Sequence, residues 1–206
     1  MRIITGTARG TKLLTPEGEN TRPTSERAKE ALFSMIQFDI DGRRALDLFA
    51  GSGQLGLEAL SRGAASCMFV DASAEAMEIV KQNIEKTHFR EKSKTLISDY
   101  RSYLRKASGR TAFDLIFLDP PYTSGALEDA LRRLYRTELM ARGCLLICES
   151  EAGEILERGE KLSEMYCALK SGGYGRVHID ILTPSEKYFE ETRENERENC
   201  GRTGEL

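Results

Sequence analysis

The sequence predicts an α/β fold in which a mostly parallel sheet of seven strands is covered by helices on both faces. From residue 44 onwards, short apolar runs alternate with helical patterns, as is typical of parallel strands joined by crossover helices. A glycine-rich turn follows the first apolar run. Near the end, two apolar runs flank a Ser-Gly-Gly-Tyr-Gly segment at 171–175, which predicts a hairpin and an antiparallel strand at one edge of the sheet.

The expected strands are short runs of mainly apolar residues. They lie at residues 45–49, 67–70, 95–97, 113–118, 144–148, 165–170 and 176–182. Between the first five strands, and after the fifth, apolar residues recur at helical spacing. The expected helices lie at residues 55–61, 74–85, 100–106, 127–139 and 151–158.

The first 43 residues predict an extension outside the sheet. Runs 2–7 and 11–14 alternate apolar and polar residues around a turn, which is a hairpin pattern. A helix is expected to begin after Pro23, capped by Thr24 or Ser25. The chain is therefore divided into a hairpin and helix extension (1–43), the sheet domain (44–183) and a charged tail (184–206) expected to be solvated or disordered.

Composition indicates a globular protein of 206 residues, with 40% hydrophobic and 31% charged residues. No apolar run approaches the roughly 18 residues that a membrane helix needs, and no signal-peptide pattern opens the chain, so a cytoplasmic protein without membrane contact is expected. Its five cysteines lack paired spacing and only two histidines occur, so we expect no metal site.

The net charge of −3 is concentrated in the tail, where seven glutamates oppose four basic residues. The first thirteen residues instead contain Arg2, Arg9 and Lys12 and no acid. A basic N-terminal hairpin is compatible with binding to RNA phosphates. Charge alone supports an ordinary solvated hairpin equally well.

The turn after the first strand is the first candidate site. Gly51, Gly53 and Gly56 satisfy the G-x-G-x-x-G pattern of dinucleotide-binding loops, so NAD binding is one interpretation and a structural turn is another. Asp47 favours a third, because a carboxylate near the loop would repel a pyrophosphate but attract a cation. S-adenosylmethionine carries an ammonium and a sulfonium group. We therefore expect this loop to bind S-adenosylmethionine, with Phe49 and Ala50 among its contacts.

Two further acids follow the next strands. Asp71 ends the second strand, 20 residues after Gly51, where a carboxylate can accept hydrogen bonds from both ribose hydroxyls of a nucleoside cofactor. Asp99 follows the third strand and can accept a hydrogen bond from an adenine amino group. Asp99 also has the position of a helix N-cap, and one residue can serve both purposes.

The strongest motif is Asp119-Pro120-Pro121-Tyr122, which directly follows the apolar strand 113–118. In an open α/β sheet, the carboxyl ends of strands line the ligand crevice. The Asp119 carboxylate and the Pro120 carbonyl can hold the two hydrogens of an exocyclic base amine, while Tyr122 stacks on the base. Catalysis would then rest mainly on positioning. The alternative is a simple strand-ending turn, but these four residues together are uncommon.

These motifs together resemble the RsmD-type 16S rRNA guanine-N2 methyltransferases. The matching stretches are 2–6, Arg9-Gly10, Leu13, Arg22-Pro23-Thr24, Ala31-Leu32-Phe33, 46–53, 55–64, 119–122 and Tyr174-Gly175. The resemblance implies a Rossmann-like class I methyltransferase domain that uses S-adenosylmethionine. It implies that Arg22 and Thr24 close one side of the cofactor pocket and that the hairpin grips RNA. The expected partner is 16S rRNA or the assembling 30S subunit, and a monomer is expected.

Two other functions stay open at this point. The first is an adenine-N6 methyltransferase acting on DNA or RNA, because the chemistry of Asp119 to Tyr122 does not distinguish adenine from guanine. The second is a catalytically silent RNA-binding assembly factor of the same fold. The joint presence of Gly51, Gly53, Asp71 and Asp119 argues against a silent protein, which needs none of them.

Overall fold

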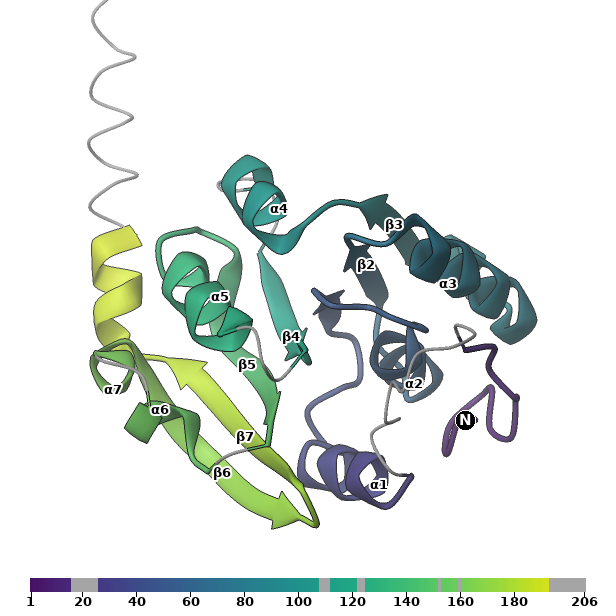
Figure 1. Ribbon diagram of the computed structural model, residues 1–206, viewed down its shortest axis with the longest axis horizontal. Coiled ribbons are helices and arrows are strands. Elements are labelled where there is room, and N and C mark those ends of the chain that lie inside the picture. Colours follow the sequence, from purple (N-terminus) through teal and green to yellow (C-terminus); the bar gives the residue numbers. More distant parts are fainter. Residues whose placement is uncertain (16–25, 108–111, 122–124, 152, 159–160, 193–206) are drawn as a thin grey trace, which may run out of the picture.

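A computed structural model of the chain describes residues 1–15, 26–107, 112–121, 125–151, 153–158 and 161–192. Its centre is a seven-stranded sheet with the order β3-β2-β1-β4-β5-β7-β6 (Figure 1). The strands are β1 (Arg44–Asp47), β2 (Ser66–Asp71), β3 (Ser93–Ile97), β4 (Phe113–Leu118), β5 (Met140–Ser150), β6 (Tyr166–Tyr174) and β7 (Val177–Pro184). Strands β1 to β5 are parallel, and β7 runs antiparallel to β5. The predicted fold class is confirmed.

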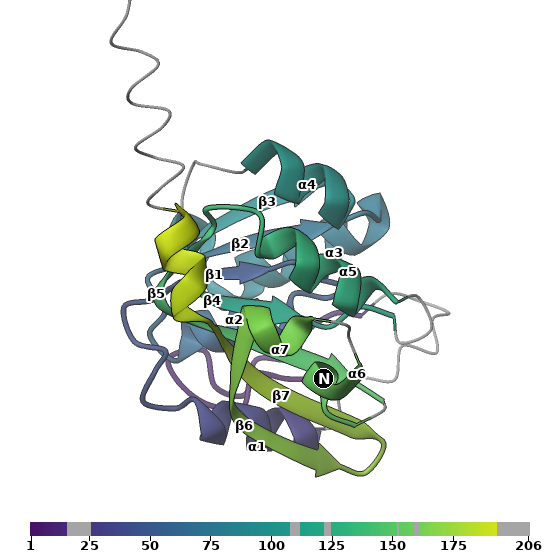
Figure 2. The same ribbon diagram turned by 90° about the vertical axis from the view of Figure 1, so that its left-hand side faces the viewer.

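Helices cover both faces of the sheet. One face packs against α1 (Glu26–Met35), α2 (Gln54–Ser61) and α3 (Ala74–Thr87). The other face, toward the viewer in Figure 2, packs against α4 (Tyr100–Ala107), α5 (Ala126–Leu134), α6 (Ile155–Arg158) and α7 (Leu162–Met165). The short 3-10 helix η1 (Arg90–Lys92) precedes β3. Side chains of β1, β2, β4, β5 and β7 alternate between two apolar clusters, so these strands contribute to both cores.

The C-terminal half differs from the prediction in detail. The expected helix 127–139 ends at Leu134, and the chain returns through a turn whose Thr137 hydroxyl donates to the Leu134 carbonyl (2.7 Å). Strand β5 is longer than expected, and the helix expected at 151–158 is confined to α6. Strand β7 inserts beside β5, so β6 is the outer strand of the hairpin.

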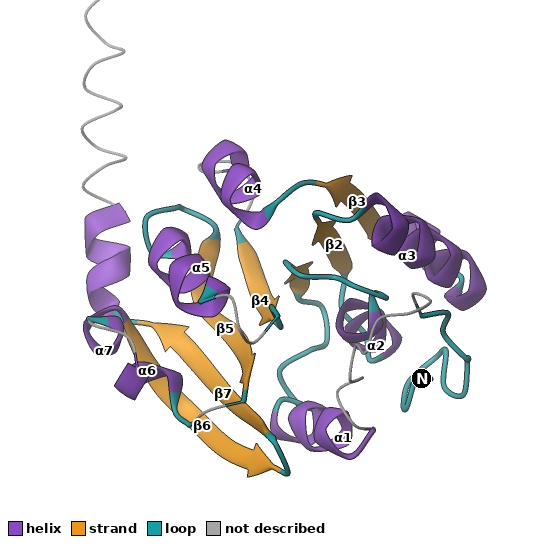
Figure 3. Cartoon of the chain, viewed as in Figure 1, coloured by secondary structure: helices purple, strands orange, loops and turns teal. Residues whose placement is uncertain are grey.

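The N-terminal hairpin exists as a chain reversal, but its arms are not regular strands (Figure 3). Among the described residues it contains one isolated antiparallel bridge, Arg2 to Lys12. Several of its backbone N–H groups bind helix α2 instead of the opposite arm. Ile4 and Thr5 donate to the Glu58 carboxylate at 2.7 and 3.0 Å, and Ala8 donates to the Ser61 hydroxyl at 3.0 Å.

Glu58 is the centre of this attachment and is fully buried. Its carboxylate also lies 3.6 Å from the Lys29 ammonium of α1 and 2.9 Å from Arg62 Nε. Lys29 donates in turn to the Arg2 carbonyl at 2.6 Å. Burial lowers the pKa of Lys29, and the neighbouring Glu58 opposes that effect. One carboxylate therefore joins the hairpin, α1 and α2.

The first part of the tail is a helix that packs one side against the rest of the protein. Residues 186–192 are helical, and Tyr188 is only 2% exposed. Its hydroxyl donates to the Thr137 carbonyl at 2.7 Å, and its ring lies 5.4 Å from that of Tyr135. Two adjacent aromatic residues, Tyr188 and Phe189, give this charged segment an apolar side. Residues 193–206 lie outside the described part. Within the described residues, no helix is both long enough and apolar enough to cross a membrane.

The Glu58 attachment predicts a large stability effect. Replacing Glu58 by Ala would leave the Lys29 ammonium buried without its partner, so we expect the free energy of unfolding to fall by about 3–5 kcal/mol. Urea denaturation followed by circular dichroism measures this change. The matched control is Arg2→Ala, which removes the exposed Arg2–Glu26 pair (3.2 Å) and should cost less than about 1 kcal/mol. Equal losses for the two variants would contradict the assignment.

Candidate active site

The loop 48–53 connects β1 to α2 and turns tightly at two glycines. Gly51 and Gly53 have φ angles of 53° and 78°, a region that side chains disfavour. The Gly53 N–H donates to the Ala50 carbonyl at 2.6 Å, and the Ala50 N–H donates to Val70 of β2 at 3.0 Å. A Cβ at Gly51 would meet no atom within 4 Å, so a ligand can approach the backbone there.

Gly56 has a different purpose. A Cβ at this position would lie 2.4 Å from Phe69 Cε1 and 2.6 Å from Cys67 Sγ, both of β2. This glycine therefore permits close packing of α2 on the sheet. The third glycine of the sequence pattern thus carries no information about which cofactor binds.

Asp47, the last residue of β1, is buried below this loop, with 2% of its surface exposed. Its Oδ2 accepts a hydrogen bond from the Gly56 N–H at 3.0 Å. Burial, with a smaller contribution from Asp71, raises the pKa of Asp47 to about 7 against the effect of that hydrogen bond. A carboxylate in this environment gains most from a cationic ligand, which would offset the cost of ionisation.

Asp71 ends β2 and already holds the loop. Its Oδ2 accepts from the Gly51 N–H and its Oδ1 from the Ser73 N–H, both at 2.8 Å. Each carboxylate oxygen has a second lone pair, so Asp71 retains acceptor capacity for hydroxyl groups of a ligand. The residue therefore fixes the turn and is available to a ribose.

Asp99 is exposed at the start of α4 and caps that helix. Its Oδ1 accepts from the Ser102 N–H at 3.0 Å, and this hydrogen bond lowers the pKa of Asp99. Next to it in the chain, Tyr100 packs against Phe49 of the glycine loop, with ring centroids 5.1 Å apart. The contact between Phe49 and Tyr100 joins the loop to α4 beside the cap.

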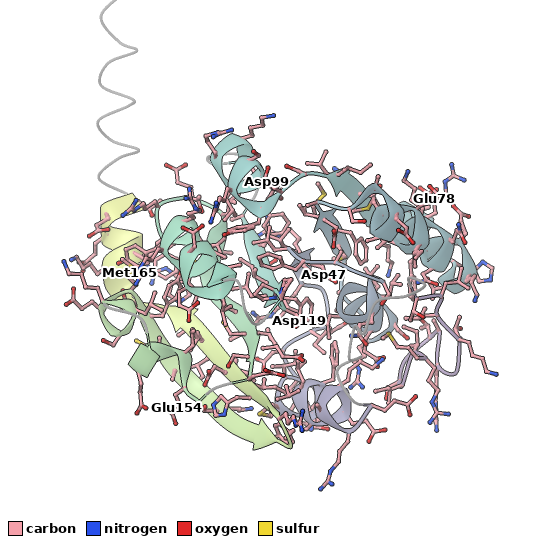
Figure 4. The ribbon with its side chains drawn as sticks, viewed as in Figure 1. Asp47, Glu78, Asp99, Asp119, Glu154 and Met165 are labelled. Carbon is pink, nitrogen blue, oxygen red and sulfur yellow. The ribbon has the colours of Figure 1, made fainter. Side chains whose placement is uncertain are left out.

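Asp119 follows β4 at the same carboxyl edge of the sheet and is half-buried. Pro120 is buried, whereas Pro121 is exposed. Figure 4 shows Asp119 and Asp47 in the middle of the molecule, where β1 and β4 end. Burial and the charges of Glu149 and then Asp47 raise the pKa of Asp119 well above its usual range. Tyr122 lies outside the described residues.

The sequence analysis missed Glu149, a residue of β5 that is only 2% exposed. Leu118 pairs with Cys148, so the next positions, Asp119 and Glu149, are neighbours on adjacent strands. Ile147 and Phe117 face the α1–α3 side, and strand alternation places Glu149 and Asp119 on that same side. A glutamate within an otherwise apolar strand was the signal that could have identified it.

The basic residues proposed for RNA contact, Arg2, Arg9 and Lys12, are all exposed on the hairpin. Arg2 pairs with Glu26 at 3.2 Å. Arg22 and Thr24 lie outside the described residues. The structure thus gathers Asp47, Phe49, Gly51, Gly53, Asp71 and Asp119 around one edge of the sheet, with Asp99 at its margin.

The sheet order and the site at the carboxyl edge define the Rossmann-like class I methyltransferase fold. The solved structure of yhhF from Escherichia coli superposes with a TM-score of 0.77 at 30% identity, covering 90% of this chain and 98% of that one. The structure of HI0767 from Haemophilus influenzae gives a TM-score of 0.74 at 28% identity, with the same coverage.

Sequence relatives identify the family. The family described as Conserved hypothetical protein 95 matches residues 1–182. YlbH of Bacillus subtilis is 39% identical over 152 residues, which is 73% of this chain and 83% of that protein. The ribosomal RNA small subunit methyltransferase D of Escherichia coli K12 is 36% identical over 151 residues, covering 73% of this chain and 75% of the relative. The chain belongs to this RsmD family, as its motifs predicted.

The raised pKa of Asp47 predicts that binding of a cation depends on pH. Below a pKa of about 7 the Asp47 carboxyl is protonated and neutral, so affinity for S-adenosylmethionine, the cofactor expected from the sequence, should fall as the pH is lowered. Calorimetric titration should give a dissociation constant about tenfold higher at pH 6 than at pH 8. Asp47→Asn should remove this dependence, and Asp99→Asn should retain it. An unchanged slope in Asp47→Asn would assign the titration to another group.

Proposed function

We propose that the protein transfers the methyl group of S-adenosylmethionine to the exocyclic N2 amine of a guanine in 16S rRNA. The observation that carries this proposal is the position of Asp119 and Pro120 directly after β4, with Asp119 beside Asp47 at the end of β1. The Escherichia coli and Haemophilus influenzae relatives are named as methyltransferases of small-subunit ribosomal RNA.

The residues present fit S-adenosylmethionine better than a dinucleotide. The buried carboxyl group of Asp47, whose pKa is raised, favours a ligand with positive charge and disfavours a pyrophosphate. In the proposed complex Asp47, which lies below the loop, attracts the ammonium group. Asp71 binds the ribose hydroxyls, and Gly51 and Gly53 allow the cofactor to approach the backbone closely. Asp99 binds the adenine amine. When bound, the cofactor supplies an electrophilic methyl group on its sulfonium.

The residues of the chain would orient the target amine. The Asp119 carboxylate and the Pro120 carbonyl accept its two hydrogens and present the nitrogen to the methyl group, so most of the rate gain comes from positioning. After methyl transfer the nitrogen is cationic and must lose a proton. Asp119, whose pKa is raised by burial and by Glu149, is a stronger base than an exposed aspartate and can accept it.

Glu149 supports guanine over adenine as the target. The Watson–Crick edge of guanine presents an N1–H donor next to its N2 amine, whereas adenine presents an N1 acceptor next to its N6 amine. Two neighbouring carboxylates, Asp119 and Glu149, match the adjacent donors of guanine and would oppose the acceptor of adenine. Glu149 therefore adds a discrimination that Asp119 to Tyr122 do not provide.

The RNA side of the proposal rests on the hairpin. Arg2, Arg9 and Lys12 are exposed on a segment that the buried Glu58 fixes to α2. Side chains on an anchored support can contact phosphates in a defined register. The expected partner is 16S rRNA or the assembling 30S subunit.

The activity can be tested with labelled S-adenosylmethionine and 30S particles or 16S rRNA lacking the modification. Mass spectrometry of the digested RNA should find N2-methylguanosine. Asp119→Ala should lower turnover by about 100-fold or more while leaving cofactor affinity nearly unchanged. The matched control is Asp114→Ala, an acid on the same strand whose carboxylate instead binds Arg44 (2.9 Å). Methyl groups on adenine or DNA only would reject the substrate, and no transfer by folded, cofactor-bound protein would favour a silent assembly factor.

The role of Glu149 predicts selectivity at the N1 position. An RNA with 2-aminopurine at the target keeps the N2 amine but has an acceptor at N1, so the wild type should prefer guanine by about 10-fold or more in kcat/KM. Glu149→Gln should reduce this preference, because the amide can donate to the N1 acceptor. Exposed Glu154→Gln is the control. The same preference in both variants would show that Glu149 does not read the base.

A further inference from the structure

The side-chain amide of Asn83, a fully buried residue of α3, joins two segments that are distant in sequence. Its Oδ1 accepts from the Leu14 N–H at 2.8 Å, and its Nδ2 donates to the Leu14 carbonyl at 3.0 Å. The same Nδ2 also donates to the Ser52 carbonyl at 2.9 Å. Three hydrogen bonds thus converge on one amide group.

The two segments are those assigned to RNA and to the cofactor. Leu14 closes the N-terminal hairpin, whose exposed side carries Arg2, Arg9 and Lys12. Ser52 lies between the two glycines of the loop that follows β1. A second contact joins the same parts, because the Ser52 hydroxyl lies 3.5 Å from the Met1 sulfur.

The chemistry of this link requires an amide. Leu14 presents both a donor and an acceptor, and Ser52 presents a second acceptor, so the central side chain must accept once and donate twice. Aspartate has no donor, and an apolar residue has neither function. The buried apolar residues Met77, Val80 and Ile84 already pack α3 against the sheet, and the amide of Asn83 is not needed for that packing. A fully satisfied buried polar group of this kind fixes one arrangement of the parts it joins.

We propose that Asn83 is a positioning residue that couples RNA binding by the hairpin to cofactor binding by the glycine loop. This inference rests on the proposed function, since it assigns RNA to the hairpin and S-adenosylmethionine to the loop. When RNA restrains the hairpin it also restrains Leu14, and the hydrogen bonds of Asn83 transmit that restraint to Ser52. By thermodynamic reciprocity, an ordered loop strengthens RNA binding by the same factor.

The test measures this coupling with S-adenosylhomocysteine, which binds without turnover. In the wild type, saturating 16S rRNA should lower the dissociation constant of S-adenosylhomocysteine by about fivefold or more. Asn83→Asp keeps the shape but removes both donated hydrogen bonds, so the coupling factor should fall to about one. The matched control is Thr87→Val, one turn further on α3. Among the residues that the structure describes, the Thr87 hydroxyl bonds within the helix, to the Asn83 and Ile84 carbonyls.

A second readout needs no RNA. Amide hydrogen exchange at Gly51 to Gly53 in the free protein should be about tenfold faster in Asn83→Asp than in Thr87→Val. If Asn83→Asp does not fold, Leu14→Pro cuts the same link from the other side, since it removes the N–H that Asn83 accepts. The coupling should fall in that variant too.

Three results would overturn the assignment. The coupling could be absent from the wild type, it could persist in Asn83→Asp or Leu14→Pro, or it could be lost equally in Thr87→Val. Failure of the proposed function would give a result different from failure of the coupling. In that case the wild type binds both S-adenosylhomocysteine and RNA, with or without coupling, but transfers no methyl group to guanine.

Discussion

The buried carboxylate of Glu58 is the interaction on which the arrangement of this protein depends. It accepts two backbone N–H groups of the hairpin and lies next to the ammonium of Lys29 and the guanidinium of Arg62. Desolvating one carboxylate is costly, and only this complete set of partners offsets that cost. Because the partners come from the hairpin, α1 and α2, the charge requirement fixes all three relative to the sheet. The exposed face of the hairpin is thereby held in one orientation.

The acidic residues at the carboxyl edge of the sheet are in a different electrostatic environment from Glu58. Asp47, Asp119 and Glu149 share one side of the sheet. Burial raises the pKa values of Asp47 and Asp119, with smaller contributions from the charge of Asp71 at Asp47 and from the charges of Glu149 and Asp47 at Asp119. Around Glu58 the chain provides the matching cations itself. At the edge, ionising Asp47 costs free energy because its pKa is raised, and a cationic ligand would offset that cost. The two acidic sites therefore differ: the Glu58 carboxylate lies beside Lys29 and Arg62, whereas burial opposes ionisation of Asp47 and Asp119 at the carboxyl edge.

Much of this could be predicted from local patterns. The strand Phe113–Leu118 and the motif after it are consecutive in the chain, so their position at the carboxyl edge followed from the periodicity alone. Glu149 was missed because its importance depends on the register between β4 and β5, which no local pattern encodes. The hairpin arms were predicted as strands because they alternate apolar and polar residues. This pattern carries no information about the side chains of α2 that accept hydrogen bonds from their N–H groups. Tyr188 was missed because its partners, Thr137 and Tyr135, lie some fifty residues earlier.

The attachment of the N-terminal residues also constrains the order in which the chain can fold. Ile4 and Thr5 bind a side chain more than fifty positions downstream, and Leu14 binds one 69 positions downstream. At a synthesis rate of about 5–20 residues per second, the basic N-terminal segment is made several seconds before Glu58 and Asn83, the side chains that bind it. During that interval its backbone N–H groups lack these partners. A segment that is made before its partners can therefore be among the last to reach its final place.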